Sequence, residues 1–297
     1  MILFAANDAL VARLADTYRR GDDVRVCTPP TAIDLAVRAF ARGQTDRHYR
    51  ADFARRAVLD VWTAREVQRL RPHTVVARSL AARRTFAAAR DIGARTVLVM
   101  DLPQLRVLHR DLDRAAAHWP DRSFLRRFRA PSWAIARQEA ERVLADHVLV
   151  RGSYAHASCV ADGIPASRLE ILPAGPSSHP PLTPPAGRTN RVRLAGLAAA
   201  RHGIDTALAA ARLAGKTLVV RIGAGSEPAD LARDPQISVD DGPVDAIICP
   251  AVCETYPPEL LATGMPVIAS PMAGGTGPDP YDAEALAAAL CAATACI

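Results

Sequence analysis

The amino-acid sequence predicts an α/β protein made of two βα domains, each with a parallel sheet. Short apolar runs alternate with longer amphipathic runs along most of the 297 residues, which is typical of strands joined by helices. A proline-rich stretch interrupts this alternation at residues 175–190, and the chain is long enough for two ordinary domains. Because such sheets bind ligands beyond the carboxyl ends of their strands, we expect a site in a cleft between the domains.

The first half of the chain contains the pattern of six strands. The predicted strands are residues 1–6, 24–30, 73–79, 95–101, 146–153 and 168–175. The predicted helices are residues 8–21, 31–70, 80–93 and 132–145, with a further helix ending near Gly163. We therefore assign residues 1–175 to an N-terminal domain.

The second half repeats the βα alternation after the proline-rich stretch. Residues 176–190 are predicted to be a linker, because they hold five prolines and no apolar periodicity. The C-terminal domain is then residues 191–297. Its predicted strands are residues 192–197, 217–223, 244–250 and 266–271, and its predicted helices are residues 203–215 and 282–293.

Composition excludes several classes of function. The formal charge is +6, but the arginines are interleaved with acids and aromatic residues make up only 5%, so we expect no nucleic-acid partner. No stretch of eighteen apolar residues and no signal peptide is found, so we expect no transmembrane segment and a cytoplasmic location. The six cysteines form no CxxC pair and are expected to be buried free thiols rather than a zinc site.

Two carboxylates stand out in the stretch PAVCETYPPELLATGMPVIAS, which covers residues 250–270. Glu254 follows a predicted strand, at the carboxyl end where a ligand of the cleft would lie. Glu259 falls in the first turn of a predicted helix that a proline starts. Acids favour helix N-termini for dipole reasons alone, so Glu259 fits a structural role as well as a binding role.

The loop from Gly196 to Gly203 joins a predicted strand to a helix whose N-cap we expect to be Asp205. A helix N-terminus beside glycine offers free N–H groups to a phosphate, and Arg201 adds a forked cation. The alternative is an ordinary turn between a strand and a helix.

Four blocks follow one another along the chain: RQEAERVLADHVLVRGSYAHASCVADGIPASRLEILPAGP (137–176), LAGLAAARHGIDTALAAARLAG (194–215), VDAIICPAVCETYPPELLATGMPVIASPMAGG (244–275) and DAEALAAAL (282–290). A weaker block, VLVMDLPQLRVLHRDLDRAAAHWP (97–120), precedes them. In this order the blocks resemble the retaining family-4 glycosyltransferases of GT-B fold.

The resemblance implies two Rossmann-like domains that face each other across a cleft, and transfer of a sugar from a nucleoside-diphosphate sugar to a small-molecule acceptor. Glu254 matches the acid that contacts the donor sugar, and Glu259 matches the acid that binds ribose. Glu254 and Arg201 are the catalytic candidates. The donor-binding candidates are Gly196, Arg201, His202, Gly203, Gly223, Glu254, Tyr256 and Glu259. No metal and no cofactor besides the sugar nucleotide is expected.

On the acceptor side, the candidates lie in the weaker block. Asp101 ends a predicted strand, and His109 and Arg110 follow in the next helix. Asp111 and Asp113 spell D-L-D, which in a helix is expected to be a solvated face rather than a metal motif.

The sequence also departs from the family pattern. The family's usual basic pair falls at Leu197 and His202, the two acids are about three residues closer than usual, and the chain ends without the usual final helix. These departures leave open a second hypothesis, a degenerate glycosyltransferase-like auxiliary or nucleotide-binding protein without turnover. A sugar-nucleotide epimerase is disfavoured, because no acid–base residues can be identified for it. The nucleotide base, the sugar, the acceptor and a homodimer or partner protein stay open.

Overall fold

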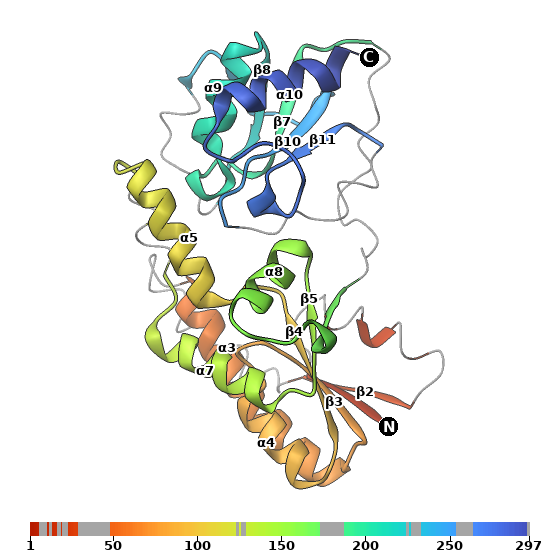
Figure 1. The fold of residues 1–297 in the computed structure, drawn as a ribbon. Coiled ribbons are helices and arrows are strands. Elements are labelled where there is room, and N and C mark those ends of the chain that lie inside the picture. The colour runs from red at the N-terminus through yellow and green to blue at the C-terminus, as the bar shows by residue number, and fades with distance from the viewer. Residues whose placement is uncertain are drawn as a thin grey trace. The chain divides into compact units, whose positions relative to one another are not determined.

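The computed structural model describes residues 1–5, 11, 14–16, 19, 23–28, 48–122, 125, 129–172, 187–223, 226, 233–253 and 264–295. Two sheets organise these residues (Figure 1). The elements of the first half are β1 (Ile2–Ala5), β2 (Val24–Cys27), α3 (His48–Leu70), β3 (Thr74–Arg78), α4 (Arg83–Asp91), β4 (Arg95–Met100), α5 (Leu105–His118), α7 (Ser132–Leu144), β5 (His147–Val150), α8 (Ser153–Ala161), η1 (Ala166–Arg168) and β6 (Leu169–Ile171). The elements of the second half are β7 (Arg191–Leu197), η2 (Ala200–His202), α9 (Ile204–Leu213), β8 (Thr217–Arg221), β9 (Ile237–Ser238), β10 (Ala246–Cys249), β11 (Val267–Ala269), η5 (Pro271–Ala273) and α10 (Ala283–Ala295).

The first sheet has the strand order β2-β1-β3-β4-β5-β6. The pairs that link β1 to β2 and β3, β3 to β4 and β4 to β5 are all parallel. Helices α3, α4 and α7 pack in sequence, α3 on α4 and α4 on α7. The six predicted strands of the first half are thus present, as parts of one sheet.

The second sheet has the order β11-β10-β7-β8-β9, and each of its four strand pairs is parallel. One face packs Val192, Leu194 and Ile248 against α9 and α10, and the other face buries Val219 and Ile247. This alternation follows from the period of two along a strand. Because α9 follows β7 in the chain, it begins at the carboxyl edge of the sheet, where the predicted phosphate loop lies.

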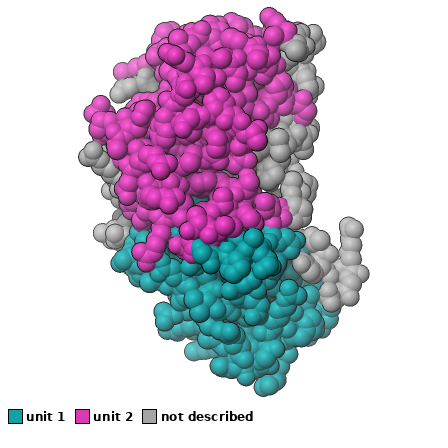
Figure 2. Space-filling view, in the orientation of Figure 1, with its two compact units in different colours: residues 1–105, 130–150, 163–170 teal, residues 106–129, 151–162, 171–297 magenta. Residues whose placement is uncertain are grey.

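Figure 2 colours two compact units. The first unit is residues 1–105, 130–150 and 163–170, and the second is residues 106–129, 151–162 and 171–297. The predicted linker, residues 176–190, lies for the most part outside the described residues, and the predicted domain boundaries stay a prediction. Among the helices of the described ranges, none is both long enough and apolar enough to cross a membrane. Cys27, Cys159, Cys249 and Cys253 are buried free thiols as expected, but Cys291 is exposed.

A buried acid ties the amino ends of three central strands of the second sheet. Asp245, which directly precedes β10 and is 0% exposed, accepts hydrogen bonds from the Thr189 N–H (2.7 Å), the Thr189 hydroxyl (2.7 Å) and the Asn190 N–H (2.9 Å). Its Oδ2 also lies 3.5 Å from Nζ of the buried Lys216, before β8. A buried carboxylate with this many donors and a cation is paired and hydrogen-bonded, as burial requires.

In the first unit, two buried acids hold the N-terminus of α4. Glu141 from α7 accepts from the N–H groups of Leu80 (2.6 Å) and Ala82 (2.9 Å). Asp60 from α3 accepts from the N–H groups of Arg84 (2.9 Å) and Thr85 (2.8 Å). Because the residue before α4 is an alanine without a capping side chain, these carboxylates satisfy the free N–H groups of the first turn.

This cluster predicts a pH dependence of stability. Burial raises the pKa of Glu141 to about 7, against the opposing hydrogen bonds from the Ala82 and Leu80 N–H groups and the charge of Arg137. The folded state therefore holds a proton that the unfolded chain releases near pH 4.5. Its contribution to the free energy of unfolding is complete below pH 4.5 and is lost as the pH rises through about 7.

Urea unfolding of the parent and of Glu141→Gln at a series of pH values measures this contribution. The unfolding free energy of the parent should fall relative to that of Glu141→Gln as the pH rises from 4.5 to about 7. Asp91→Asn, which changes an exposed acid of the same unit, is the control and should show a constant difference. A pH-independent difference for Glu141→Gln would contradict the prediction.

Candidate functional site

The predicted phosphate loop is a tight connection between β7 and α9. The short helix η2 fills it, and Ala199, Ala200 and Ile204 are 0% exposed. Its first N–H, of Ala198, donates to the carbonyl of Arg221 at the end of β8 (2.8 Å). Gly223 follows β8 and lies beside this loop, since a Cβ there would be 3.2 Å from Cδ2 of Leu197. The structure thus brings Gly196, Arg201, His202, Gly203 and Gly223 into one region at the carboxyl edge of the second sheet.

His202 folds back on its own loop. Its side chain is buried, and Nδ1 lies 2.8 Å from the Leu197 nitrogen and 2.9 Å from the Leu197 oxygen. Gly196 makes room for the ring: its φ is 94°, and a Cβ there would lie 2.8 Å from Nδ1 of His202. The imidazole therefore stabilises the loop backbone, and contact with a donor phosphate stays a prediction.

Gly203 joins the loop to the stretch that precedes Glu254. Its φ is 77°, and a Cβ at this position would lie 2.0 Å from the carbonyl oxygen of Pro250. The N–H of Val252 donates to the carbonyl of Arg201 (3.0 Å). The chain then reaches Cys253, which is buried, one residue before Glu254. Glu254, Tyr256 and Glu259 themselves lie outside the described residues.

The N-cap of α9 differs from the one expected. Gly203 takes the N-cap position, without a side-chain hydrogen bond, and Asp205 lies in the first turn. The left-handed conformation of Gly203 turns the chain two residues earlier than a side-chain cap at Asp205 requires. The carboxylate of Asp205 instead accepts hydrogen bonds from Nε of Arg122, at 3.2 Å to Oδ1 and 3.1 Å to Oδ2. It also forms an ion pair with Nη2 of Arg122. The prediction of Asp205 as the N-cap is wrong.

A second connection reaches the same region from β11. The hydroxyl of Ser270 donates to the carbonyl of Ala251 (2.8 Å) and accepts from the N–H of Ala273 (3.1 Å). The turn that follows is tight, because a Cβ at Gly275 would lie 2.3 Å from the carbonyl oxygen of Ala269. In the same unit, the Ser153 hydroxyl donates to the carbonyl of Gly274 (2.8 Å). The glycine pair of the third block thus borders the stretch that leads to Glu254.

Asp101 directly follows β4 in the first unit, as predicted, but its carboxylate is engaged inside the protein. Arg78 donates to its Oδ2, and Arg56 lies 3.6 Å from the same oxygen. Burial acts to raise the pKa of Asp101, but the Arg78 hydrogen bond and the Arg56 charge outweigh it and hold the pKa below its ordinary value. A carboxylate held this way is ionised at neutral pH. Its role toward an acceptor stays a prediction.

His109 and Arg110 lie on α5 and belong to the second unit. Burial lowers the pKa of His109, the nearby charge of Arg129 lowers it further, and so the ring is neutral at pH 7. The Arg129 guanidinium also donates to the backbone carbonyl of His109 (2.8 Å). Arg110 is exposed. The acceptor-side candidates are thus divided between two units, each described by itself.

Asp111 is not on a solvated face. It is 2% exposed and accepts a hydrogen bond of 2.5 Å from the hydroxyl of Tyr154 on α8. Asp111 lies on the helix face of the buried Leu108, Leu112 and Ala115, and this apolar spacing was the signal that could have revealed it. Burial and the bond to Asp111 raise the pKa of Tyr154, so its hydroxyl remains a donor. Asp113, in contrast, is exposed as predicted.

Within the described residues, no group of three or more His, Cys, Asp or Glu side chains could hold a metal ion. The expectation that the reaction needs no metal stays a prediction.

No family model and no curated protein matches the sequence. Among solved structures, sucrose-phosphate synthase from Thermosynechococcus elongatus is similar with a TM-score of 0.54 and 18% identity, over 80% of this chain and 68% of that chain. The lipopolysaccharide outer core galactosyltransferase WaaB is similar with a TM-score of 0.54 and 15% identity, over 99% of this chain and 90% of that chain. Sequence identities this low support a shared fold and nothing more. The chain has the GT-B fold, with two Rossmann-like α/β domains, as the sequence predicted.

Proposed function

We propose that the protein is a retaining, family-4-like glycosyltransferase that moves a sugar from a nucleoside-diphosphate sugar to a small-molecule acceptor. The observation that carries this proposal is the junction at Gly203. There the loop after β7 contacts Pro250, which follows β10 and lies four residues before Glu254 in the sequence. A diphosphate at the loop and a sugar at Glu254 would be neighbours in this arrangement.

Each proposed residue meets one requirement of the reaction. The loop N–H groups at the start of α9 and the guanidinium of Arg201 would stabilise the departing diphosphate. Glu254 would orient the donor sugar through its hydroxyls, and Glu259 would bind the ribose hydroxyls. In a same-face displacement, the leaving phosphate itself can take the acceptor proton, so no protein nucleophile is assigned.

A mass-spectrometric screen tests this proposal. UDP-, GDP- and dTDP-sugars are offered with a panel of small acceptors, and a product heavier by one sugar is expected for one donor. With that donor, Glu254→Gln and Arg201→Ala should each lower kcat/KM by about 10- to 100-fold, because each removes a hydrogen bond to a charged group. Glu170→Gln in the first unit is the control and should leave turnover unchanged. Unchanged turnover in both Glu254→Gln and Arg201→Ala would show that the roles proposed for these two residues are wrong.

The alternative is a protein that binds a nucleotide without turnover. The position of His202 favours it, because the ring engages the backbone of Leu197 where the resembling family places a basic pair. Calorimetric titration with UDP, GDP and dTDP separates the two. Tight binding together with a negative screen supports the alternative, and no binding by any nucleotide excludes both functions.

A further inference from the structure

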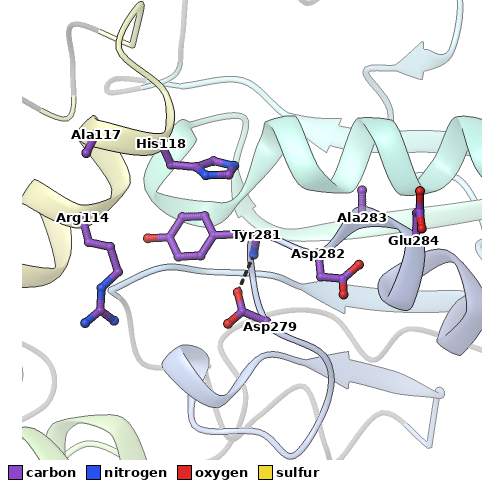
Figure 3. A pocket seen from close by; sticks show the side chains of 8 residues that line it. All are labelled: Arg114, Ala117, His118, Asp279, Tyr281, Asp282, Ala283 and Glu284. Atoms are coloured by element: carbon purple, nitrogen blue, oxygen red, sulfur yellow. Dashed lines mark hydrogen bonds between the residues drawn. The ribbon is translucent and has the colours of Figure 1, made fainter.

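A hollow of about 960 Å³ opens between the end of α5 and the start of α10, within the second unit (Figure 3). Its size suits a small molecule. The polar and aromatic side chains at its wall are Arg114, His118, Asp279, Tyr281, Asp282 and Glu284. None of them belongs to the residues proposed for the nucleotide sugar.

The charge of this hollow is opposite in sign to that of the chain. Three carboxylates face one guanidinium, so its formal charge is −2 with the histidine neutral, whereas the whole chain carries +6. Two of the acids also fix the local backbone: Asp279 accepts from the Tyr281 N–H (2.9 Å), and Asp282 accepts from the Ala285 N–H (2.9 Å). Each keeps a second carboxylate oxygen, and the field of the group favours a cation and opposes phosphates.

The wall between the acids and α5 is aromatic. The rings of His118 and Tyr281 lie 4.7 Å apart, and Trp119 lies 5.2 Å from Tyr281. Phe, Trp and Tyr make up only 5% of the residues, and two of them, Trp119 and Tyr281, meet in this cluster beside His118. Aromatic faces bind cations and the apolar faces of ring-shaped ligands.

The hydroxyl of Tyr281 needs an acceptor. Its oxygen is buried and has no hydrogen-bond partner among the residues that the structure describes. Figure 3 shows the ring reaching toward α5, with the hydroxyl at the end nearer Arg114. Burial raises the pKa of Tyr281 to about 12, so the group stays a donor at neutral pH. A buried donor without a partner is costly, and a ligand oxygen would remove that cost once the ring turns its hydroxyl toward the hollow.

We propose that this hollow binds a small polyhydroxylated amine of the amino-sugar class. The ammonium group would lie among the carboxylates of Asp279, Asp282 and Glu284, and the ring would pack on Tyr281 and His118. Hydroxyl oxygens would accept from Tyr281 and Arg114. This site is separate from the donor residues and does not depend on the proposed transfer reaction.

Titration of the full chain, without nucleotide, tests the site with three sugars that differ at one group. Glucosamine carries the cation, N-acetylglucosamine replaces it by a neutral amide, and glucose replaces it by a hydroxyl. We expect glucosamine to bind, and both neutral sugars to bind at least about tenfold more weakly, because they lose a charge-assisted contact. Ligand-observed NMR or calorimetry measures the affinities.

Two variants assign the binding to the hollow. Asp279→Asn/Asp282→Asn/Glu284→Gln removes the charge but keeps oxygens that can cap the turn and α10. This triple variant should bind glucosamine at least about tenfold more weakly than the parent and melt at the same temperature. Tyr281→Phe keeps the ring and should weaken glucosamine about fivefold. Glu170→Gln is the control for charge and should change nothing.

Three outcomes would overturn the proposal: no binding of glucosamine, equal binding of all three sugars, or unchanged glucosamine binding in the triple variant. If the triple variant does not fold, unchanged binding by Tyr281→Phe overturns it instead. None of these outcomes bears on the nucleotide sugar, since no donor is present in the titration.

Discussion

Replacing Gly203 with alanine is expected to lower the free energy of unfolding by about 3 kcal/mol or more. The φ of 77° costs an alanine about 1 kcal/mol or more by itself. The added methyl group would also lie 2.0 Å from the carbonyl oxygen of Pro250, so the loop and the end of β10 must separate. The same separation should abolish sugar transfer, because it moves the loop away from the stretch that leads to Glu254.

Gly215→Ala is the matched control, since Gly215 follows the other end of the same helix, α9. Its φ is 62°, but nothing lies within 4 Å of a Cβ there. Gly215→Ala carries the conformational cost without the clash, so we expect it to lower the free energy of unfolding by about 1 kcal/mol. Urea unfolding of the two variants measures the difference between them. Equal losses would show that Pro250 can move aside, and would contradict the tight contact at Gly203.

The second large effect is expected at Asp245. Asp245→Asn should destabilise the protein by about 3–5 kcal/mol, because it leaves the buried Lys216 without its counter-charge. It also turns an amide N–H₂ group toward backbone donors of Thr189 and Asn190. Asp241→Asn is the comparison: its carboxylate is 75% exposed and pairs with Arg193 and Arg221, and we expect less than about 1 kcal/mol.

The effect of Asp245 should also depend on pH. Burial acts to raise its pKa, but the hydrogen bonds of Thr189 and the charge of Lys216 prevail and hold the pKa below the ordinary 3.8. Its stabilisation is therefore complete above about pH 3.8 and is lost as the pH falls through the lower folded-state pKa. In acid, the parent should approach Asp245→Asn in stability. If the difference in unfolding free energy between the two proteins stays constant down to the pH at which acid unfolds them, Asp245 does not titrate in this way.

The fold was predictable because its signal is local. Apolar runs at residues 192–197, 217–223 and 244–250 correspond to β7, β8 and β10, and the amphipathic run at 203–215 corresponds to α9. A parallel strand buried on both faces must be apolar along its length, so its sequence reveals it. The two-residue strand β9 was missed, since Ile237–Ser238 is too short to show a period.

The site was less predictable, because its contacts join residues far apart in the chain. That Arg122 pairs with Asp205, and Tyr154 with Asp111, cannot be deduced from either partner alone. The fold-back of His202 depends on the room that Gly196 leaves, which the sequence shows only as a glycine. The hollow beside Tyr281 unites α5 with the start of α10, more than 150 residues later, and the sequence gives no sign of it.

The aromatic cluster has a further use, as an optical probe. The chain has three tryptophans: Trp62 and Trp133 fall in the first unit, and Trp119 alone falls in the second. The ring of Trp119 lies 5.2 Å from the ring of Tyr281, which lines the hollow. In a Trp62→Phe/Trp133→Phe background, the indole emission therefore reports on the second unit by itself. The unfolding of one unit, and the arrival of a ligand at its rings, can then be followed by light without any attached label.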